Sequence, residues 1–187
     1  AALLGDTSEP IEAICERASW EDGLVVPANY NSPGQIVISG EAAAVERAME
    51  LAKASGAKRA MRLNVSGAFH SPLMEPAAVG LAQALDAARF DAPAFPIYAN
   101  VNAEPVTDAG TARSLLLRQL TAPVRWTDVV TRLAERFPSA LFVEMGPGTV
   151  LAGLAKKIAP SLRTAACGTA ADVERLLGEL AGAAPAA

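Results

Sequence analysis

The residue with the clearest chemical potential in this 187-residue chain is His70, the only histidine in the sequence. It lies in a polar loop just after Ser66, Gly67 and Phe69, rather than in the apolar stripe of a helix. An imidazole there can act as a general base near neutral pH. However, the chain contains no Gly-x-Ser-x-Gly elbow, and no cysteine lies near His70 in sequence. The residues alone indicate a base without a nucleophile, with a purely structural histidine as the alternative.

Two weaker patterns lie further along the chain. Gly146-Pro147-Gly148 separates a predicted strand from a predicted helix, where backbone N–H groups can bind an anion. The segment is too short for a phosphate-binding loop and lacks its lysine, so a tight turn is the simpler interpretation. Glu144 and Asp128 do not form a convincing acid pair, because nothing in the sequence fixes their spacing.

Amide side chains surround a predicted hairpin turn near the start of the chain. Asn29, Asn31 and Gln35 flank or occupy Asn31-Ser32-Pro33-Gly34. They could line a polar pocket, although Asn, Ser, Pro and Gly are also the ordinary residues of a turn. Both interpretations stay open at this point.

Composition excludes several classes of protein. The chain is 51% hydrophobic and 19% charged with a net charge of −4, so it can bury a core instead of remaining disordered. Its longest apolar runs are broken by Gly, Pro or charge, which argues against a membrane span. The basic residues are scattered, so we expect no nucleic-acid partner. Cys15 and Cys167 are far apart and have no spacing for a metal, which predicts buried free thiols, a reducing compartment and no bound metal.

Residues 1–64 contain a regular succession of elements. The hydrophobic pattern and the turn residues predict a strand at 1–4, a helix at 10–18, strands at 24–30 and 35–39, a helix at 41–55 and a strand at 58–63. This β-α-β-β-α-β order is that of a ferredoxin-like subdomain.

Residues 65–187 form a second predicted region after a boundary near residue 65. We expect helices at 73–89, 109–120, 126–136 and 149–158 and from 171 onwards, and strands at 93–101, 140–144 and 163–167. The low-complexity tail, 181–187, is expected to fray. Strands that alternate with helices predict a parallel sheet covered on both faces, so the fold class is α/β.

Four segments of the chain carry a family resemblance. The hairpin segment 29–40, the loop 67–74 around His70, the segment 119–126 and the segment 143–148 resemble, in order and spacing, bacterial malonyl-CoA:acyl carrier protein transacylases. The resemblance extends over nearly the whole chain. It implies an α/β-hydrolase-like core with an inserted ferredoxin-like subdomain, of which residues 65–187 would be the C-terminal part.

The resemblance also implies an activity. These enzymes transfer a malonyl group from malonyl-CoA to the phosphopantetheine thiol of acyl carrier protein in fatty-acid biosynthesis, without a cofactor and in the cytoplasm. Their nucleophilic serine lies in a Gly-His-Ser-Leu-Gly segment upstream of the subdomain, and no such segment occurs in these 187 residues. We therefore expect the chain alone to be inactive, and its partners to include the N-terminal half of the same enzyme.

The roles of individual residues follow from the same resemblance. His70 matches the family's general base, and Gln119 matches the position whose carbonyl holds the other ring nitrogen of that base. Phe69, Asn31 and Ser66 are expected to line the substrate site. A phenylalanine at position 69 goes with malonyl rather than methylmalonyl units in related acyltransferases.

Two alternatives stay open. An acyltransferase domain of a polyketide synthase would carry the same histidine loop, although such domains more often have His or Tyr where this chain has Gly67. A module that binds acyl carrier protein or CoA without turnover would also explain the absence of a nucleophile.

Overall fold

The computed structural model of this chain describes residues 1–20 and 23–182. Its contacts divide the chain into two compact units, Ala1–Val129 and Val130–Ala187. Among the described residues, no helix is long and apolar enough to cross a lipid bilayer. The predicted fraying of 181–187 falls largely on 183–187, which lie outside the described residues, whereas residues 181 and 182 end the last helix.

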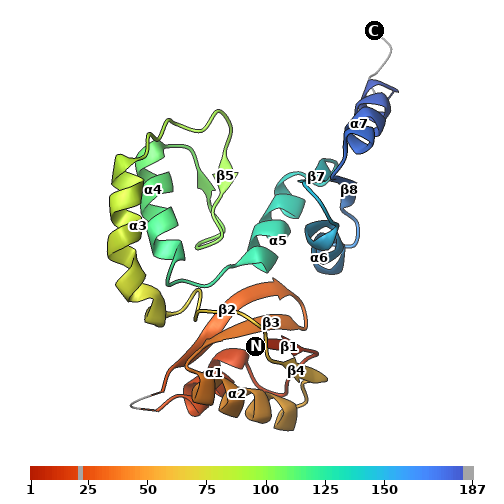
Figure 1. The fold of residues 1–187 in the computed structure, drawn as a ribbon. Helices are drawn as coiled ribbons and strands as arrows, with labels where there is room; N and C mark the ends of the chain where they lie inside the picture. The colour runs from red at the N-terminus through yellow and green to blue at the C-terminus, as the bar shows by residue number, and fades with distance from the viewer. Residues whose placement is uncertain (21–22, 183–187) are drawn as a thin grey trace. The chain divides into compact units, whose positions relative to one another are not determined.

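The first unit begins with a four-stranded antiparallel sheet and two helices (Figure 1). The elements are β1 (Ala2–Leu4), α1 (Ile11–Ala18), β2 (Val25–Ser32), β3 (Gln35–Gly40), α2 (Ala42–Ala54) and β4 (Arg59–Met61). The predicted β-α-β-β-α-β order along the chain is confirmed. The strands lie in the order β2-β3-β1-β4, and each neighbouring pair is antiparallel.

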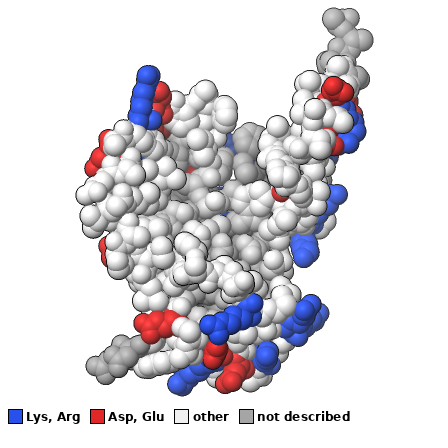
Figure 2. Space-filling model, viewed as in Figure 1, with Lys and Arg blue, Asp and Glu red and all other residues white. Residues whose placement is uncertain are grey.

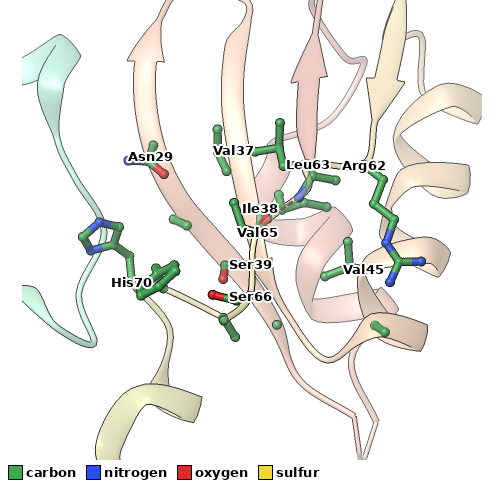
Figure 3. Close-up of a pocket in the computed structure, with 17 residues that line it drawn as sticks. Asn29, Val37, Ile38, Ser39, Val45, Arg62, Leu63, Val65, Ser66 and His70 are labelled. Atoms are coloured by element: carbon green, nitrogen blue, oxygen red, sulfur yellow. Dashed lines mark hydrogen bonds between the residues drawn. The ribbon is translucent and has the colours of Figure 1, made fainter. Parts of the chain in front are cut away.

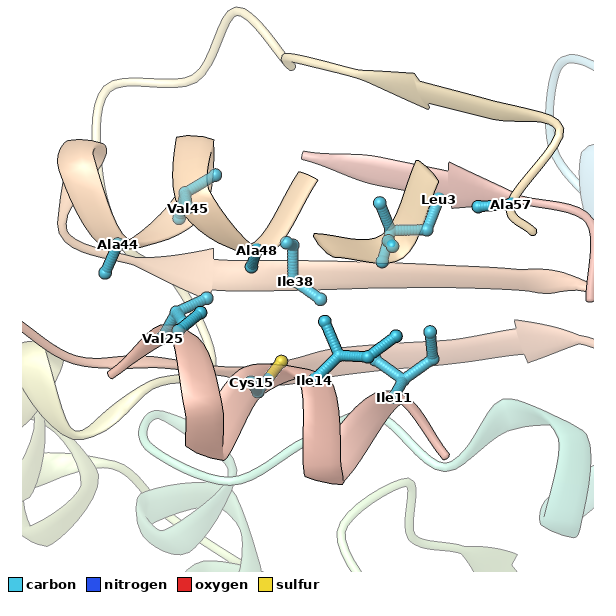
Figure 4. Close-up of a cluster of buried hydrophobic side chains, with 12 residues drawn as sticks. Leu3, Ile11, Ile14, Cys15, Val25, Ile38, Ala44, Val45, Ala48 and Ala57 are labelled. Atoms are coloured by element: carbon cyan, nitrogen blue, oxygen red, sulfur yellow. The ribbon is translucent and has the colours of Figure 1, made fainter. Parts of the chain in front are cut away.

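Apolar spacing explains why both helices pack against the sheet. In α1 the buried residues recur every three or four positions, so they share one face. That face and the small residues of α2 meet the inward side chains of the strands in one cluster (Figure 4). The members drawn and labelled there are Leu3, Ile11, Ile14, Cys15, Val25, Ile38, Ala44, Val45, Ala48 and Ala57.

The hairpin between β2 and β3 is tighter than the sequence indicates. Ser32 pairs with Gln35, so the turn consists of Pro33 and Gly34 alone. Gly34 has φ +66°, a left-handed conformation that glycine adopts without strain. Asn31 was predicted to be part of the turn and belongs instead to β2, where the register shifts between Tyr30 and Ser32.

The rest of the first unit combines helices with a short pair of strands. It comprises a short 3-10 helix, η1 (Pro72–Met74), then α3 (Glu75–Ala87), β5 (Ile97–Tyr98), β6 (Pro105–Val106), α4 (Ala109–Gln119) and the start of α5 (Trp126–Arg136). The strand predicted over 93–101 is reduced to β5, because Pro93 and Pro96 offer no N–H to a partner strand. β5 pairs antiparallel with β6, a strand that was not predicted.

The segment between α4 and α5 is tied to the edge of the first sheet. Val124 forms a parallel bridge with Asn29 in β2. Its N–H donates to the carbonyl oxygen of Ala28 (2.8 Å), and its own carbonyl oxygen accepts from Tyr30 N–H (2.9 Å). Residues 123–125 therefore lie along β2, and the end of α4 is fixed relative to the hairpin.

The second unit contains a parallel pair of strands with helices. Its elements after α5 are β7 (Leu141–Met145), α6 (Val150–Ile158), β8 (Arg163–Cys167) and α7 (Ala170–Gly182), as the sequence predicts. The strands β7 and β8 pair in parallel over five residues each. The strand predicted over 93–101 is not part of this parallel sheet, since β5 pairs antiparallel with β6 in a sheet of its own. Coverage of the parallel sheet on both faces stays a prediction. The domain boundary near residue 65 stays a prediction.

Candidate active site

His70 lies in a turn of unusual backbone conformation. Its φ is +59°, in the left-handed region that residues with a side chain rarely adopt. The next residue, Ser71, is fully buried, and its hydroxyl donates to the carbonyl oxygen of Ala68 (2.7 Å). Pro72 then begins η1. The turn leaves the His70 side chain half-buried.

One ring nitrogen of His70 is held by the backbone. Nδ1 lies 2.9 Å from the carbonyl oxygen of Gln119. A carbonyl oxygen can only accept a hydrogen bond, so Nδ1 carries the proton of the neutral ring. Nε2 consequently keeps its lone pair, as a general base requires.

The helix end explains why this carbonyl is available. Residue 119 ends α4, and the last carbonyls of a helix have no partner within it. The neighbouring carbonyls are used in the turn that follows: Leu117 accepts from Leu120 N–H, and Arg118 accepts from Ala122 N–H. The Gln119 side chain bonds elsewhere, since its Nε2 donates to the carbonyl oxygens of Ala122 (2.8 Å) and Pro123 (3.2 Å). Gln119 therefore holds His70 through its backbone, and its side chain closes the turn.

A cavity of about 510 Å³ lies beside His70 (Figure 3). Its floor is the β2–β3 hairpin, and its rim is the loop that follows β4. The polar side chains that line it are Asn29, Ser39, Arg62, Ser66 and His70, and the larger apolar ones are Val37, Ile38, Val45, Leu63, Val65 and Phe69. A mixed lining with few polar groups is typical of a small-molecule site.

The structure brings most of the predicted site residues together. His70, Phe69 and Ser66 line the same cavity, and Gln119 reaches His70 through its carbonyl. Asn31 is not among the lining residues, because it lies close to the hairpin tip; Asn29, two residues earlier, lines the cavity instead. The role of each of these residues stays a prediction.

Arg62 and Ser39 also line the cavity, and sequence reasoning did not single them out. Ser39 alternates along its strand with the buried Ile38, but both residues line the cavity, so the alternation alone does not single Ser39 out. Arg62 follows the end of β4, where no periodic pattern exists.

The weaker candidates have structural partners. Both oxygens of the Glu144 carboxylate accept N–H groups at the start of α6, from Leu151 (3.0 Å) and Ala152 (2.8 Å). The helix N-terminus after Gly146-Pro147-Gly148 thus receives an anion from the chain itself. Asp128 pairs with Arg125 at 2.6 Å.

The two cysteines are free and buried, as predicted. Burial, together with the nearby Glu12 carboxylate, raises the pKa of the Cys15 thiol to about 12, so this thiol is not a nucleophile at neutral pH. Within the described ranges 1–20 and 23–182, no group of three or more His, Cys, Asp or Glu side chains could hold a metal ion.

Known proteins match this chain in sequence and in fold. It is 43% identical over 174 residues to the malonyl CoA-acyl carrier protein transacylase of Bacillus subtilis, an alignment covering 93% of the chain and 55% of the relative. The structure of a Vibrio cholerae acyl carrier protein S-malonyltransferase superposes with a TM-score of 0.88 at 42% identity, over 94% of this chain and 56% of that one.

A third match is a malonyl-transacylase solved in complex with a type II polyketide synthase acyl carrier protein. Its TM-score is 0.89 at 42% identity, with 95% of this chain and 57% of that chain covered. The chain thus spans about half the length of the proteins it matches. The predicted resemblance to malonyl-CoA:acyl carrier protein transacylases is confirmed. Because the acyl transferase domain family matches residues 3–181, the chain belongs to that family.

Proposed function

We propose that this chain supplies the general base of a malonyl-CoA:acyl carrier protein transacylase. The observation that carries the proposal is the bond between His70 Nδ1 and the Gln119 carbonyl oxygen, at the edge of a cavity of about 510 Å³. The relatives' names support malonyl-CoA and acyl carrier protein as the two substrates.

The proposed reaction proceeds through an acyl-serine. His70 Nε2 takes the proton of a serine hydroxyl as its oxygen bonds to the malonyl carbonyl carbon. The carbon–sulfur bond to CoA then breaks, and the protonated imidazole returns the proton to the departing thiolate. The thiol of acyl carrier protein repeats these steps in reverse and receives the malonyl group. A neutral carbonyl partner orients His70 without adding a negative charge, which suffices because a thiolate is a good leaving group.

The proposed architecture assigns 1–64 to a ferredoxin-like subdomain and 65–187 to the C-terminal part of an α/β-hydrolase-like core. The antiparallel order β2-β3-β1-β4 supports the first assignment. Exposed apolar side chains after residue 64 support the second, because a core that is completed by another segment needs such a surface. We propose that the N-terminal half of the enzyme, which carries the serine, covers it.

A role in fatty-acid biosynthesis in the cytoplasm is part of this proposal. Polyketide synthesis is the second candidate pathway, and one observation favours it: one matched transacylase was solved with a polyketide synthase acyl carrier protein. A module that binds acyl carrier protein or CoA without turnover is the third candidate.

Intact-mass measurement tests the proposal. The purified 187-residue chain should keep its mass after incubation with malonyl-CoA, because it holds no Gly-x-Ser-x-Gly serine. The protein expressed from the complete open reading frame should gain one malonyl group that survives denaturation. A malonyl adduct on the 187-residue chain, or no adduct on the complete protein, would contradict the proposed mechanism. Discharge of the adduct by acyl carrier protein then separates an enzyme from a binding module.

A further inference from the structure

Two polar side chains are buried in the described part of the chain, those of Ser32 and Ser71. Ser71 has no exposed surface and directly follows His70. Its hydroxyl donates to the carbonyl oxygen of Ala68 at 2.7 Å, which closes the chain around Phe69 and His70. We propose that Ser71 is a positioning residue, whose hydroxyl holds the His70 ring in one orientation and one tautomer.

The backbone of His70 needs such a restraint. A residue with a β-carbon is strained at φ +59° and stays there only when its surroundings hold it. The Ser71–Ala68 bond supplies this restraint on the turn itself. On the other side, Ser71 is extended (φ −129°, ψ 161°), as a residue before proline must be, and its carbonyl oxygen accepts from Met74 N–H (3.0 Å). Ser71 thus caps η1, and its two hydrogen bonds hold the strained turn closed.

The consequence concerns the two ring nitrogens. With the turn closed, Nδ1 lies 2.9 Å from the Gln119 carbonyl oxygen, and the proton is confined to Nδ1. If the turn opened, His70 would relax out of the left-handed region and this bond would lengthen. Both neutral tautomers would then be populated, and Nε2 would carry the proton for part of the time.

The same geometry excludes a different role for Ser71. A serine beside a histidine suggests a nucleophile, but this hydroxyl is fully buried and already donates to a backbone carbonyl. A substrate carbonyl has no access to it. The hydroxyl therefore acts on the turn, and not on an acyl group.

Nitrogen NMR of the imidazole tests this inference on the 187-residue chain. His70 is the only histidine, so its two ring signals need no assignment. The wild-type chain should show the Nδ1–H tautomer alone. Ser71→Ala should shift both ring nitrogens towards values averaged over the two tautomers. Ser32→Ala, which removes the other buried hydroxyl (3% exposed), is the matched control and should leave the pattern unchanged.

Several results would contradict the proposed role of Ser71. Averaged tautomers in the wild-type chain, or an unchanged pattern in a folded Ser71→Ala, would overturn the inference. If Ser71→Ala does not give a dispersed spectrum, Ser71→Cys, which keeps a weak donor, should show a smaller shift in the same direction. Unfolding of both variants would show that Ser71 is required for folding, and this result would also overturn the inference.

The effect on rate rests on the proposed function. In the protein from the complete reading frame, Ser71→Ala should lower kcat about 10²-fold with little change in KM, because a displaced base affects proton transfer rather than binding. A tautomer change without any loss of rate would contradict the proposed role of His70 as the base. The inference about Ser71 would survive that result.

Discussion

Residues 1–64 and residues 65–182 differ in how completely the chain covers its own apolar side chains. The first region buries Leu3, Ile14 and Ile38 almost fully, and among its described residues only Trp20 and Leu63 are large, apolar and exposed. In the second region the exposed large apolar side chains are Val65, Phe69, Leu73, Val79, Phe95, Ile97, Leu116, Phe137, Met145, Val150, Leu151, Val173, Leu177 and Leu180. One region covers most of its own large apolar side chains, and the other leaves many of them exposed.

Figure 2 shows the charged side chains on one face of the molecule. Lys, Arg, Asp and Glu side chains are mixed over the helices of the first region, as on an ordinary solvated surface. The candidate site draws on both regions: the packed hairpin forms the floor of the cavity, and His70 and Gln119 come from the less covered region. We therefore expect substitutions in the packed first region to change the free energy of unfolding, and substitutions at His70 to change the reaction rate.

The largest expected effect is on the chemical step. In the protein from the complete reading frame, His70→Ala should lower the acylation rate by about 10²- to 10⁴-fold, the usual contribution of a general base. Its thermal midpoint should move little, because the His70 side chain makes one hydrogen bond, worth about 1 kcal/mol. Stopped-flow acylation and a thermal melt on the same sample test both parts. Equal rates for the two proteins would remove His70 from the mechanism.

A pair of apolar substitutions tests the structural side of the comparison. Ile14 is 0% exposed and Val79 is 67% exposed. In the 187-residue chain, Ile14→Ala should lower the free energy of unfolding by about 2–5 kcal/mol, as for other buried large-to-small changes. Val79→Ala should change it by less than about 0.5 kcal/mol. Urea unfolding measures both.

The same Val79→Ala substitution in the complete protein tests whether another segment covers α3. If an N-terminal half covers α3, Val79→Ala should destabilise the complete protein by more than about 1 kcal/mol while leaving the 187-residue chain unaffected. Equal, small effects in both would show that Val79 faces solvent in both. The comparison between the two regions would then not extend to α3.

The sequence predicted elements better than the contacts between them. The pattern of Ile11, Ile14 and Cys15 specifies a helix face locally, so α1 and its neighbours were predicted to within a few residues. The strand over 93–101 was overestimated, because Pro93 and Pro96 offer no N–H for pairing with another strand.

The sequence identified residues of the candidate site better than the contacts between them. That a carbonyl at position 119 meets His70 came from family resemblance, because a contact 49 residues apart leaves no local pattern. The bond from Ser71 to Ala68 and the φ of +59° at His70 were not predicted at all. A buried hydroxyl has no signature in residue type. His is enriched among left-handed residues other than glycine, but such residues are too uncommon for the type alone to predict one.

A smaller effect is expected on the choice of acyl group. Phe69 is 48% exposed and lines the His70 cavity, where a benzyl group leaves little room beside a branched α-carbon. One methyl group is worth about 10- to 200-fold in discrimination, so Phe69→Ser should erase a good part of the preference for malonyl-CoA over methylmalonyl-CoA. The measurement is kcat/KM for both esters in the complete protein. Phe137→Ser, at a similarly exposed position (44%), should leave the ratio unchanged. An unchanged ratio in Phe69→Ser would place selectivity elsewhere in the pocket.

The smallest effect is expected at Gln119, and it separates backbone from side chain within the same residue. Gln119→Ala keeps the carbonyl that holds His70 and loses only the two bonds from the amide to Ala122 and Pro123. Neutral hydrogen bonds contribute about 0.5–1.5 kcal/mol each to stability. Neither bond touches the reacting atoms, so only part of this energy should appear in the barrier, and the acylation rate should fall by no more than about tenfold. Gln119→Met, which keeps the length without a donor, should behave in the same way. A loss in both variants as large as that of His70→Ala would mean that the side-chain amide holds the base, and that the carbonyl contact is incidental.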